Sequence, residues 1–235
     1  MIKILQSWTE VGAAIGYLAN IGLDKKTRVY HSTPIKNWDL AQIARLLQHY
    51  PKTIKILDMG CGGSSVLRFC YKNGFVNTYG IDIVINFSDR WRQLMYWKNN
   101  GFKLPYYLQA QNITETNFEN NFFDVMICLS VIEHHVNLTE FVSEASRILK
   151  TGGLLYVSTD YHDAKLKTFD APLNYESQAG EWNIFSKAEI VRLILLAKKY
   201  RLHLRKEEIP KMKQAIINWN TKKYTFLSMV FYKSA

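Results

Sequence analysis

Short apolar runs alternate with amphipathic stretches through the middle of the chain, from about residue 54 to residue 161. The apolar runs have the length and composition of buried strands, whereas the stretches between them repeat their apolar residues at helical spacing. The expected strands are 54–60, 78–83, 106–111, 122–130 and 154–161, and the expected helices run through Val66 and Cys70, from Trp91 to Trp97 and from about Leu138 to Leu149. Such alternation implies right-handed crossovers and a parallel sheet.

The first part of the chain shows a different pattern and is expected to be largely helical up to about residue 50. Apolar residues recur at helical spacing from Trp38 to Leu47, after Asn37 as a candidate helix cap, and the pattern ends near Pro51. We therefore divide the chain into an N-terminal helical segment, 1–50, which covers the site, and a Rossmann-like domain, 51–235.

The last part of the chain begins with a clear helix start. Ser186 and Glu189 have the spacing of a capping box ahead of an apolar run. Two strand-like stretches follow, 202–209 and 224–232, and they are expected to pair antiparallel. The expected fold is an α/β, Rossmann-like, mostly parallel sheet of seven strands, with helices on both faces and a C-terminal antiparallel hairpin.

A long stretch without periodicity, from about Tyr161 to Phe185, follows the end of an expected strand. Loops of this length in a compact domain are usually functional. Ligands of open α/β sheets bind outside the carboxyl ends of the strands, so this loop is expected to border the site.

Composition narrows the class of protein. The chain has 48% hydrophobic and 21% charged residues, and no apolar run reaches the length of a membrane span, so we expect a cytoplasmic protein without membrane contact. Cys61, Cys70 and Cys128 match no zinc or disulfide spacing, which indicates reduced thiols. The net charge of +10 is spread along the chain, which disfavours nucleic acid as a partner but leaves it open.

A glycine-rich turn follows the first expected strand of the alternating series. Gly60, Cys61 and Gly62 stand between that strand and a helix, and glycine lets a ligand approach the backbone closely. Asp82, followed by Ile83, comes 22 residues after Gly60 at the end of the next strand. A carboxylate at that place can accept hydrogen bonds from ribose hydroxyls, so the unit fits a nucleoside cofactor.

The details of the turn separate two kinds of cofactor. A dinucleotide site would require a glycine where Ser65 stands. Instead, Asp58 precedes Gly60 by two positions, and the stretch resembles the first motif, D/E-x-G-x-G-x-G, of class I methyltransferases that use S-adenosylmethionine. That cofactor carries an ammonium and no phosphate, so a carboxylate beside the turn suits it. Ser64 replaces the third glycine of the motif.

The resemblance continues over roughly residues 52–160 and is closest to methyltransferases of type 11. Asn112 and Ile113 match the pair that contacts adenine in the family, and Ser130 falls where the family places the methionine part of the cofactor. The stretch 147–153 resembles the family's turn into the fifth strand. Further along, the sequence resembles bacterial methyltransferases of glycan and secondary-metabolite pathways. The resemblance thus implies that Asp58, Gly60, Cys61, Gly62, Asp82, Ile83, Asn112, Ile113 and Ser130 bind S-adenosyl-L-methionine.

Methyl transfer is an in-line displacement, so an enzyme chiefly has to align the reactants in a dry pocket. An alcohol acceptor also requires a general base, for which histidine has a suitable pKa. The candidates are Glu133, His134 and His135 after the fourth expected strand, and Tyr161, His162 and Asp163 after the fifth. Each of these residues also has a structural interpretation. Glu133 and His134 resemble a feature that recurs after the fourth strand in many such methyltransferases, and Tyr161 and His162 could cap the fifth strand.

A metal site is considered because quinone-pathway O-methyltransferases resemble this chain at Glu133 and His134. They can pair these two residues with a glutamate three positions earlier, where this chain has Ser130. Two ligands make an incomplete site for a hard cation, so we expect no metal.

The expected function is methyl transfer to an oxygen or nitrogen of a small molecule or saccharide. Alternatives are an RNA or protein methyltransferase that uses the basic surface, a noncatalytic nucleoside-binding protein and a nicotinamide oxidoreductase. The sequence identifies neither the acceptor nor the oligomeric state.

Overall fold

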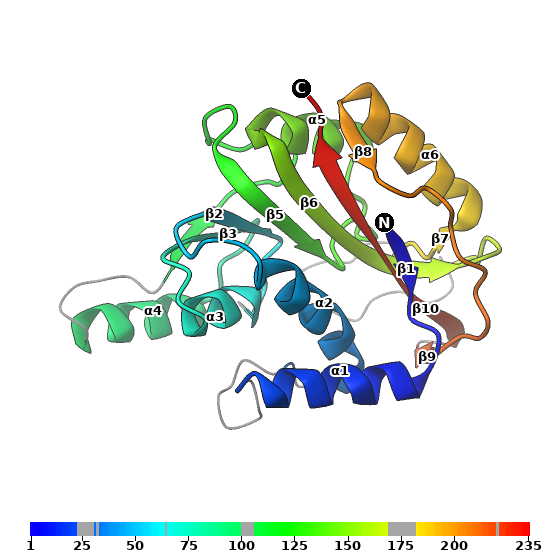
Figure 1. Cartoon of the computed structure of the whole chain (residues 1–235), viewed down its shortest axis with the longest axis horizontal. Coiled ribbons are helices and arrows are strands. Elements are labelled where there is room, and N and C mark those ends of the chain that lie inside the picture. The colour runs from blue at the N-terminus through cyan, green and yellow to red at the C-terminus, as the bar shows by residue number, and fades with distance from the viewer. Residues whose placement is uncertain (23–30, 32, 64, 100–105, 169–181, 220) are drawn as a thin grey trace.

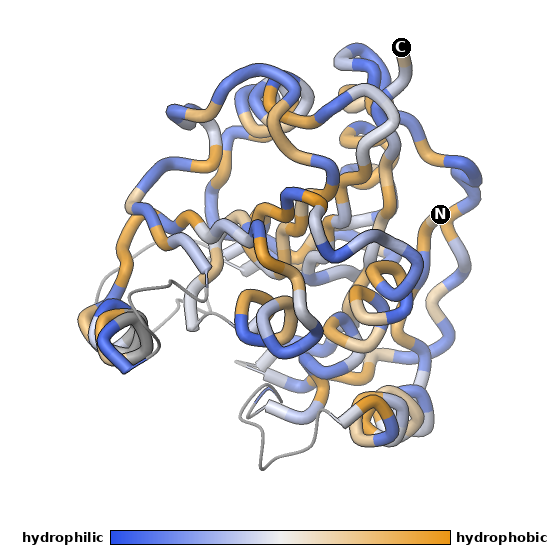
Figure 2. Tube along the Cα trace, turned by 60° about the vertical axis from the view of Figure 1, so that its left-hand side comes forward, coloured by the Kyte–Doolittle hydropathy of each residue, from blue (hydrophilic) through white to orange (hydrophobic). Residues whose placement is uncertain are grey.

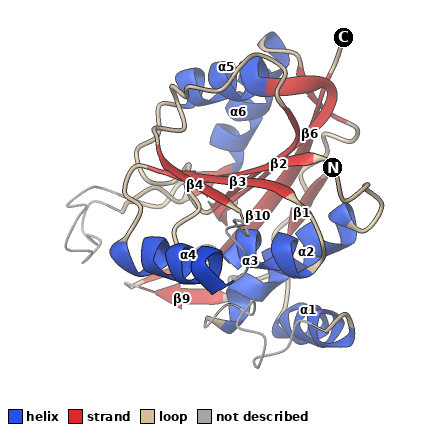
Figure 3. Cartoon of the chain, turned by 90° about the vertical axis from the view of Figure 1, so that its left-hand side faces the viewer, coloured by secondary structure: helices blue, strands red, loops and turns tan. Residues whose placement is uncertain are grey.

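The computed structural model describes the chain apart from residues 23–30, 32, 64, 100–105, 169–181 and 220. Within the described residues, five parallel strands form the centre of the sheet in the order β4, β3, β2, β5, β6 (Figures 1 and 3). They span Tyr107–Ala110 (β4), Asn77–Asp82 (β3), Lys55–Met59 (β2), Phe123–Leu129 (β5) and Leu149–His162 (β6). These are the five runs expected as strands, so the parallel core is confirmed.

Antiparallel strands complete the sheet beside β6. β10 (Lys222–Lys233) pairs with β6, while β1 (Ile2–Ile4) and β8 (Leu202–Leu204) pair with successive segments of β10. The expected antiparallel pairing at the C-terminal end is therefore confirmed. Two further short strands, which the sequence pattern does not predict, are β7 (Phe185–Ser186) beside β6 and β9 (Ile217–Trp219) beside β10.

Two layers of helices enclose the sheet (Figure 3). One face carries α1 (Trp8–Asn20), the 3-10 helix η2 (Pro34–Lys36), α2 (Asn37–Leu47), α3 (Ser65–Lys72) and α4 (Phe87–Asn99), and the other carries α5 (Leu138–Ile148) and α6 (Lys187–Lys199). Figure 2 shows hydrophobic positions along the central strands and hydrophilic positions in the turns around them. The capping box at Ser186 is present, with the Ser186 side chain accepting from Glu189 N–H.

The described part of the N-terminal segment is largely helical, as expected, but it differs from the expectation in two places. Residues 2–4 form the edge strand β1 instead of helix, because their backbone pairs with β10. Asn37 does not cap α2 but is its first residue. Its buried side chain instead braces the preceding turn, accepting from His31 N–H at 2.9 Å and donating to Pro34 O at 3.0 Å. Asn37 thereby fixes the turn that carries Lys36.

The alternation of side chains along β6 assigns its residues to the two faces. Leu155 and Tyr161 belong to the buried cluster that includes α5 and α6, whereas Leu154 and Tyr156 belong to the cluster that includes α1, α2 and α3. Because side chains alternate along a strand, Asp160 faces the same side as Tyr156. β6 thus presents a carboxylate to the N-terminal helices at the carboxyl edge of the sheet.

Candidate active site

The glycine turn lies where β2 ends, against the end of β3. Gly60 has a φ of 73°, a conformation that residues with a Cβ disfavour. Its N–H donates to Ile81 O at 2.8 Å. A Cβ at Gly60 would run into the side chain of Val131, in the loop after β5. The reason for glycine at this position is therefore close packing against Val131 as well as backbone conformation.

The side chain of Asp82 holds the second half of the turn in place. Gly62 N–H donates to Asp82 Oδ2 at 2.9 Å, and Val84 N–H lies 3.4 Å from Oδ1. The next residue, Ile83, is 63% exposed although it is apolar. A carboxylate and an exposed apolar side chain at the end of β3 suit the ribose and the adenine of a nucleoside.

Asp58 is buried in β2, and burial raises the pKa of its carboxyl to about 8, with the charge of Asp82 adding to the shift. Within the described residues no hydrogen bond to this carboxylate is present. A buried carboxylate without a protein donor is costly, and a cation beside it would lower that cost. The ammonium of S-adenosylmethionine fits this requirement.

The remaining residues expected to bind the cofactor do not all face this edge of the sheet. Asn112 is exposed, and its Oδ1 accepts from Thr114 N–H at 3.0 Å, whereas Ile113 is buried in the core. Cys61 is buried in a small cluster with Leu67, and its N–H donates to Ile81 O. The structure thus brings Asp58, Gly60, Gly62, Asp82 and Ile83 to one edge, while Ile113 and the Cys61 thiol point into the protein.

A lysine from the N-terminal segment reaches the end of β5. Lys36 Nζ donates to Ser130 Oγ at 2.5 Å and lies 4.4 Å from the centre of the Phe226 ring. Ser130 has a φ of 51°, and its N–H donates to Ser158 O at 3.0 Å. The ammonium therefore sits between η2, the end of β5 and β10, beside the expected cofactor edge.

Three buried carboxylates lie near enough to this lysine to be affected by its charge. Glu133 accepts from Thr159 Oγ1 at 3.1 Å, Asp160 from Trp182 Nε1 at 2.7 Å, and Asp39 from Tyr156 OH at 2.9 Å. Burial raises the pKa of all three, and the positive charge of Lys36 opposes that rise in each case. Asp160 raises the pKa of Glu133 further because the two carboxylates repel each other.

The other candidate bases lie in different surroundings. His134 is half-buried, and burial lowers its pKa, with the charge of Lys36 adding to the shift. Tyr161 is buried in the core on the α5 and α6 side, where its OH donates to Asp163 at 2.7 Å. His162 Nδ1 lies 3.1 Å from Ala164 N. The charge of Lys36 therefore acts on Glu133 and His134, whereas Tyr161 and His162 make local contacts.

Four residues of this arrangement are absent from the candidates named from the sequence. They are Lys36, Asp39, Asp160 and Trp182. Asp160 could have been found, because strand alternation from Tyr156 places it on the same face. Lys36 and Asp39 carry no sequence signal, since their partners stand 94 and 117 positions away.

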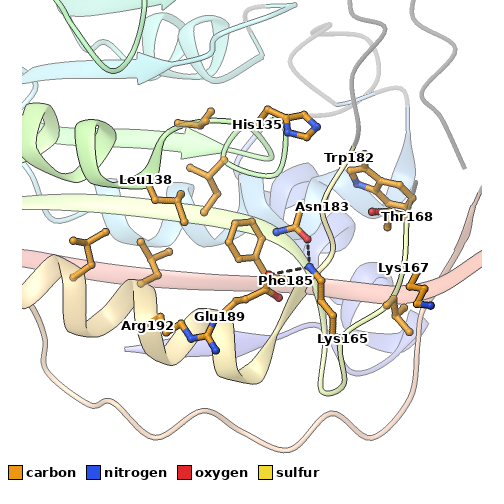
Figure 4. Close-up of a pocket in the computed structure, with 15 residues that line it drawn as sticks. His135, Leu138, Lys165, Lys167, Thr168, Trp182, Asn183, Phe185, Glu189 and Arg192 are labelled. Atoms are coloured by element: carbon orange, nitrogen blue, oxygen red, sulfur yellow. Dashed lines mark hydrogen bonds and ion pairs between the residues drawn. The ribbon is translucent and has the colours of Figure 1, made fainter. Parts of the chain in front are cut away.

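A cavity lies on the other side of this site, between α5, α6 and the segment after β6 (Figure 4). Its volume is about 700 Å³, and its walls are mainly apolar, with Lys165, Glu189 and Arg192 among the charged residues that line it. Lys165 bridges Glu189 at 2.8 Å and Asn183 at 2.5 Å. The expected site loop 161–185 reaches this cavity with its described ends, and its middle, 169–181, lies outside the described residues.

Two features are absent from the described part of the chain. No helix there is long and apolar enough to cross a membrane. No group of three or more His, Cys, Asp and Glu side chains there could hold a metal ion. The expectation that the enzyme needs no metal stays a prediction.

The comparisons with known proteins agree with this architecture. Residues 57–157 match the family model described as a methyltransferase domain. The fold is that of a putative sarcosine dimethylglycine methyltransferase from Galdieria sulphuraria, with a TM-score of 0.60, 16% identity and coverage of 95% of this chain and 98% of the other. The chain therefore carries, over residues 57–157, a domain similar to a methyltransferase domain, within a fold shared with methyltransferases that use S-adenosylmethionine.

Two more similar proteins are a curated relative and a solved structure. A ubiquinone biosynthesis O-methyltransferase from Rickettsia canadensis is 34% identical over 119 residues, which are 50% of this chain and 48% of the relative. The chain thus spans about half the length of the curated relatives it matches. A geranyl diphosphate C-methyltransferase from Streptomyces coelicolor, crystallised with S-adenosyl-L-homocysteine, has a TM-score of 0.59 at 16% identity, with 86% of this chain and 85% of the other covered.

Proposed function

We propose that the protein transfers a methyl group from S-adenosylmethionine to a hydroxyl oxygen of a small molecule. The observation that carries this proposal is the half-buried ammonium of Lys36, which donates to Ser130 Oγ at the end of β5 and whose charge acts on the buried carboxylate of Glu133. A hydroxyl has one proton to lose and one oxygen to be held, and these two groups supply both functions. The Rickettsia relatives are named as O-methyltransferases, and this supports oxygen as the acceptor atom.

The residues at the ends of β2, β3 and β4 hold the cofactor in this proposal. Asp58 pairs with its ammonium, Asp82 accepts from its ribose, and Ile83 and Asn112 contact its adenine, while Gly60 and Gly62 keep the turn close. When bound, the cofactor supplies an electrophilic methyl group on a sulfonium. The protein contributes alignment and a site from which water is excluded.

The acceptor in this proposal lies at Ser130, Lys36, Glu133 and His134. Glu133 takes the proton of the acceptor hydroxyl, because its raised pKa brings it toward the working pH. His134 is neutral at that pH, since burial lowers its pKa, and serves as a second proton acceptor. Tyr161 and His162 keep the end of β6 in place and thereby act indirectly.

One set of measurements tests the proposal. Calorimetric titrations with S-adenosylmethionine, S-adenosylhomocysteine and NAD define the cofactor. Purified protein with S-adenosylmethionine is then offered separate pools of phenols, aliphatic alcohols, sugars and amines, and S-adenosylhomocysteine formation is followed. We expect product with hydroxyl acceptors. Product with amines alone would contradict O-methylation, and tight NAD binding without binding of either methionine derivative would contradict methyl transfer.

A further inference from the structure

The cavity between α5, α6 and the segment after β6 is separate from the residues proposed to hold the cofactor (Figure 4). Within the described part of the chain, none of its lining residues belongs to the turn at Gly60 or to the ends of β3 and β4. Its volume of about 700 Å³ is typical of pockets that bind small molecules. It is therefore a candidate binding site to which the proposed methyl transfer assigns no ligand.

Apolar side chains from three elements form most of the cavity wall. They are Ile132 and Val136 from the loop after β5, Phe185 from β7, and Leu193 and Leu196 from α6. An apolar group that enters the cavity is removed from water together with these side chains, which favours binding. The occupant therefore needs an apolar body.

The charged side chains of the cavity leave a positive excess. Lys165, Lys167 and Arg192 line it together with one carboxylate, that of Glu189. This carboxylate is already engaged, because Oε2 accepts from Ser186 N–H at 2.8 Å and from Ser186 Oγ at 2.6 Å, while Oε1 accepts from Lys165 Nζ at 2.8 Å. Glu189 thus neutralises Lys165 and leaves Lys167 and Arg192 without a counter-charge among the described residues.

Arg192 is the unpaired cation whose shape best suits an anionic group. Figure 4 shows Arg192 and Glu189 on α6, with Lys165 joined to Glu189 and to Asn183. Within the described residues the guanidinium of Arg192 makes no hydrogen bond and no ion pair. A guanidinium presents its N–H donors as a planar fork that matches the two oxygens of a carboxylate.

We propose that this cavity binds an amphipathic monoanion, an apolar molecule that carries one carboxylate. Its apolar body packs against Phe185 and Leu196, and its carboxylate accepts from Arg192. The inference goes beyond the proposed methyl transfer and does not depend on it, because neither Asp58 nor Glu133 lines the cavity. A neutral apolar molecule would use the same walls without the guanidinium, so the effect of charge separates the two kinds of ligand.

The test uses two fluorescent probes that emit more strongly in apolar surroundings. Anilinonaphthalene sulfonate is apolar and anionic, and N-phenylnaphthylamine has the same rings without the anionic group. Both are titrated into the whole protein, with and without saturating S-adenosylhomocysteine. We expect saturable binding of the anionic probe that decanoate displaces and S-adenosylhomocysteine does not.

Arg192→Met isolates the role of the guanidinium. The affinity for the anionic probe should fall by about tenfold, the lower end of the range for a hydrogen bond to a charged group, because Arg192 is exposed. The affinity for the neutral probe should stay nearly unchanged. Lys199→Met is the matched control, since it removes the same charge from an exposed position of α6 outside the cavity wall and should affect neither probe.

A second pair of variants locates the apolar body. Leu196→Trp fills the cavity and should weaken both probes, whereas Leu195→Trp places the same side chain at a position that is 54% exposed and outside the wall, and should weaken neither. If Leu196→Trp does not fold, the comparison of Arg192→Met with Lys199→Met still decides, because both replaced side chains are exposed.

Three results would overturn the assignment. They are equal affinities for the anionic probe in Arg192→Met and Lys199→Met, undiminished binding of both probes in a folded Leu196→Trp, and displacement of the anionic probe by S-adenosylhomocysteine. These measurements need no methyl transfer, so a failure to methylate any hydroxyl compound would contradict the proposed function and leave this site unaffected.

Discussion

The backbone N–H of Gly62 donates a 2.9 Å hydrogen bond to the carboxylate of Asp82, so one acidic side chain both organises the glycine turn and faces the cofactor edge. Removal of this side chain should affect binding in two ways. We expect Asp82→Ala to weaken S-adenosylmethionine binding by roughly 1.5–3 kcal/mol, the range for hydrogen bonds to a charged group. Titration calorimetry measures the change.

Asp82→Asn is the matched control, because its amide oxygen can still accept from Gly62 N–H while the charge is lost. Its affinity should lie between those of Asp82→Ala and the unmodified protein. An unchanged dissociation constant in Asp82→Ala would remove this residue from the site.

Close packing at Gly60 can be separated from backbone strain. Gly60 and Gly74 have φ angles of 73° and 81°, but only a Cβ at Gly60 would meet another side chain, that of Val131. Gly74→Ala should lower the free energy of unfolding by about 1–2 kcal/mol, the strain of the left-handed conformation. Gly60→Ala should lower it more and abolish cofactor binding.

The double variant Gly60→Ala, Val131→Ala should recover part of the stability lost in Gly60→Ala, as measured by urea denaturation. Equal losses in Gly60→Ala and Gly74→Ala, with no recovery in the double variant, would show that Val131 is irrelevant to this glycine.

The parts of the fold that the sequence predicts are those set by local pattern. The five parallel strands and the helix at Ser186 follow from periodicity and capping, which involve residues within one turn or one strand. The edge strand β1 has only three residues and pairs with β10 at the other end of the chain, so no local pattern distinguishes it from the start of a helix.

The residues of the candidate site also differ in whether a local sequence pattern identifies them. The spacing of Asp58, Gly60 and Asp82 is visible in the sequence because one βαβ unit carries all three. Lys36 gains its significance only when the N-terminal segment folds over the end of β5, 94 positions further along. Asp58 and its neighbours can therefore be named from a motif, whereas the acceptor side depends on tertiary packing.

Protonation of Asp58 should be linked to cofactor binding. Burial raises the pKa of this carboxyl to about 8, so it is largely protonated at pH 7 in the free protein. A bound ammonium favours the carboxylate and lowers that pKa. We expect S-adenosylmethionine binding at pH 7 to release up to about one proton from Asp58, and the release should vanish well above pH 8.

Calorimetry in buffers of different ionisation enthalpy measures this proton release. Asp58→Asn should release fewer protons at pH 7, although the ammonium of the ligand titrates in the same range and is measured separately in the buffer.

The free energy of unfolding should also depend on the protonation of Asp58. Because the folded pKa of Asp58 exceeds its unfolded value, its contribution to stability falls as pH rises from about 4 to 8, and Asp58→Asn should flatten that part of the curve.

Metal removal gives a further test of the acceptor side. Ser130 stands where a third ligand beside Glu133 and His134 would be required, and its Oγ is engaged by Lys36. Methyl transfer and cofactor binding should therefore survive prolonged treatment with chelator. Loss of activity that magnesium restores would show that Glu133 and His134 do bind a cation.

The bases of the reaction can be ranked by comparing Glu133, His134 and His162. Glu133 is buried beside Asp160 and under the influence of Lys36, and its raised pKa means that it ionises above the usual range of a glutamate. If its carboxylate takes the acceptor proton, kcat should rise with pH through that raised pKa. Glu133→Gln should then lower turnover by roughly 10²–10⁴-fold and remove the rise, with cofactor affinity nearly unchanged.

His134→Ala tests the second proton acceptor on the same loop. A loss of comparable size, with the Glu133 pH dependence intact, would assign the proton transfer to His134, whereas a loss below about tenfold would leave the role to Glu133. His162→Ala is the matched control, since the ring nitrogen of His162 contacts the backbone of Ala164, and any loss there should follow thermal stability. If none of the three substitutions alters methyl transfer to an acceptor that the unmodified protein uses, then alignment alone drives the reaction, and Lys36 is left to hold a hydroxyl that reaches the site already ionised.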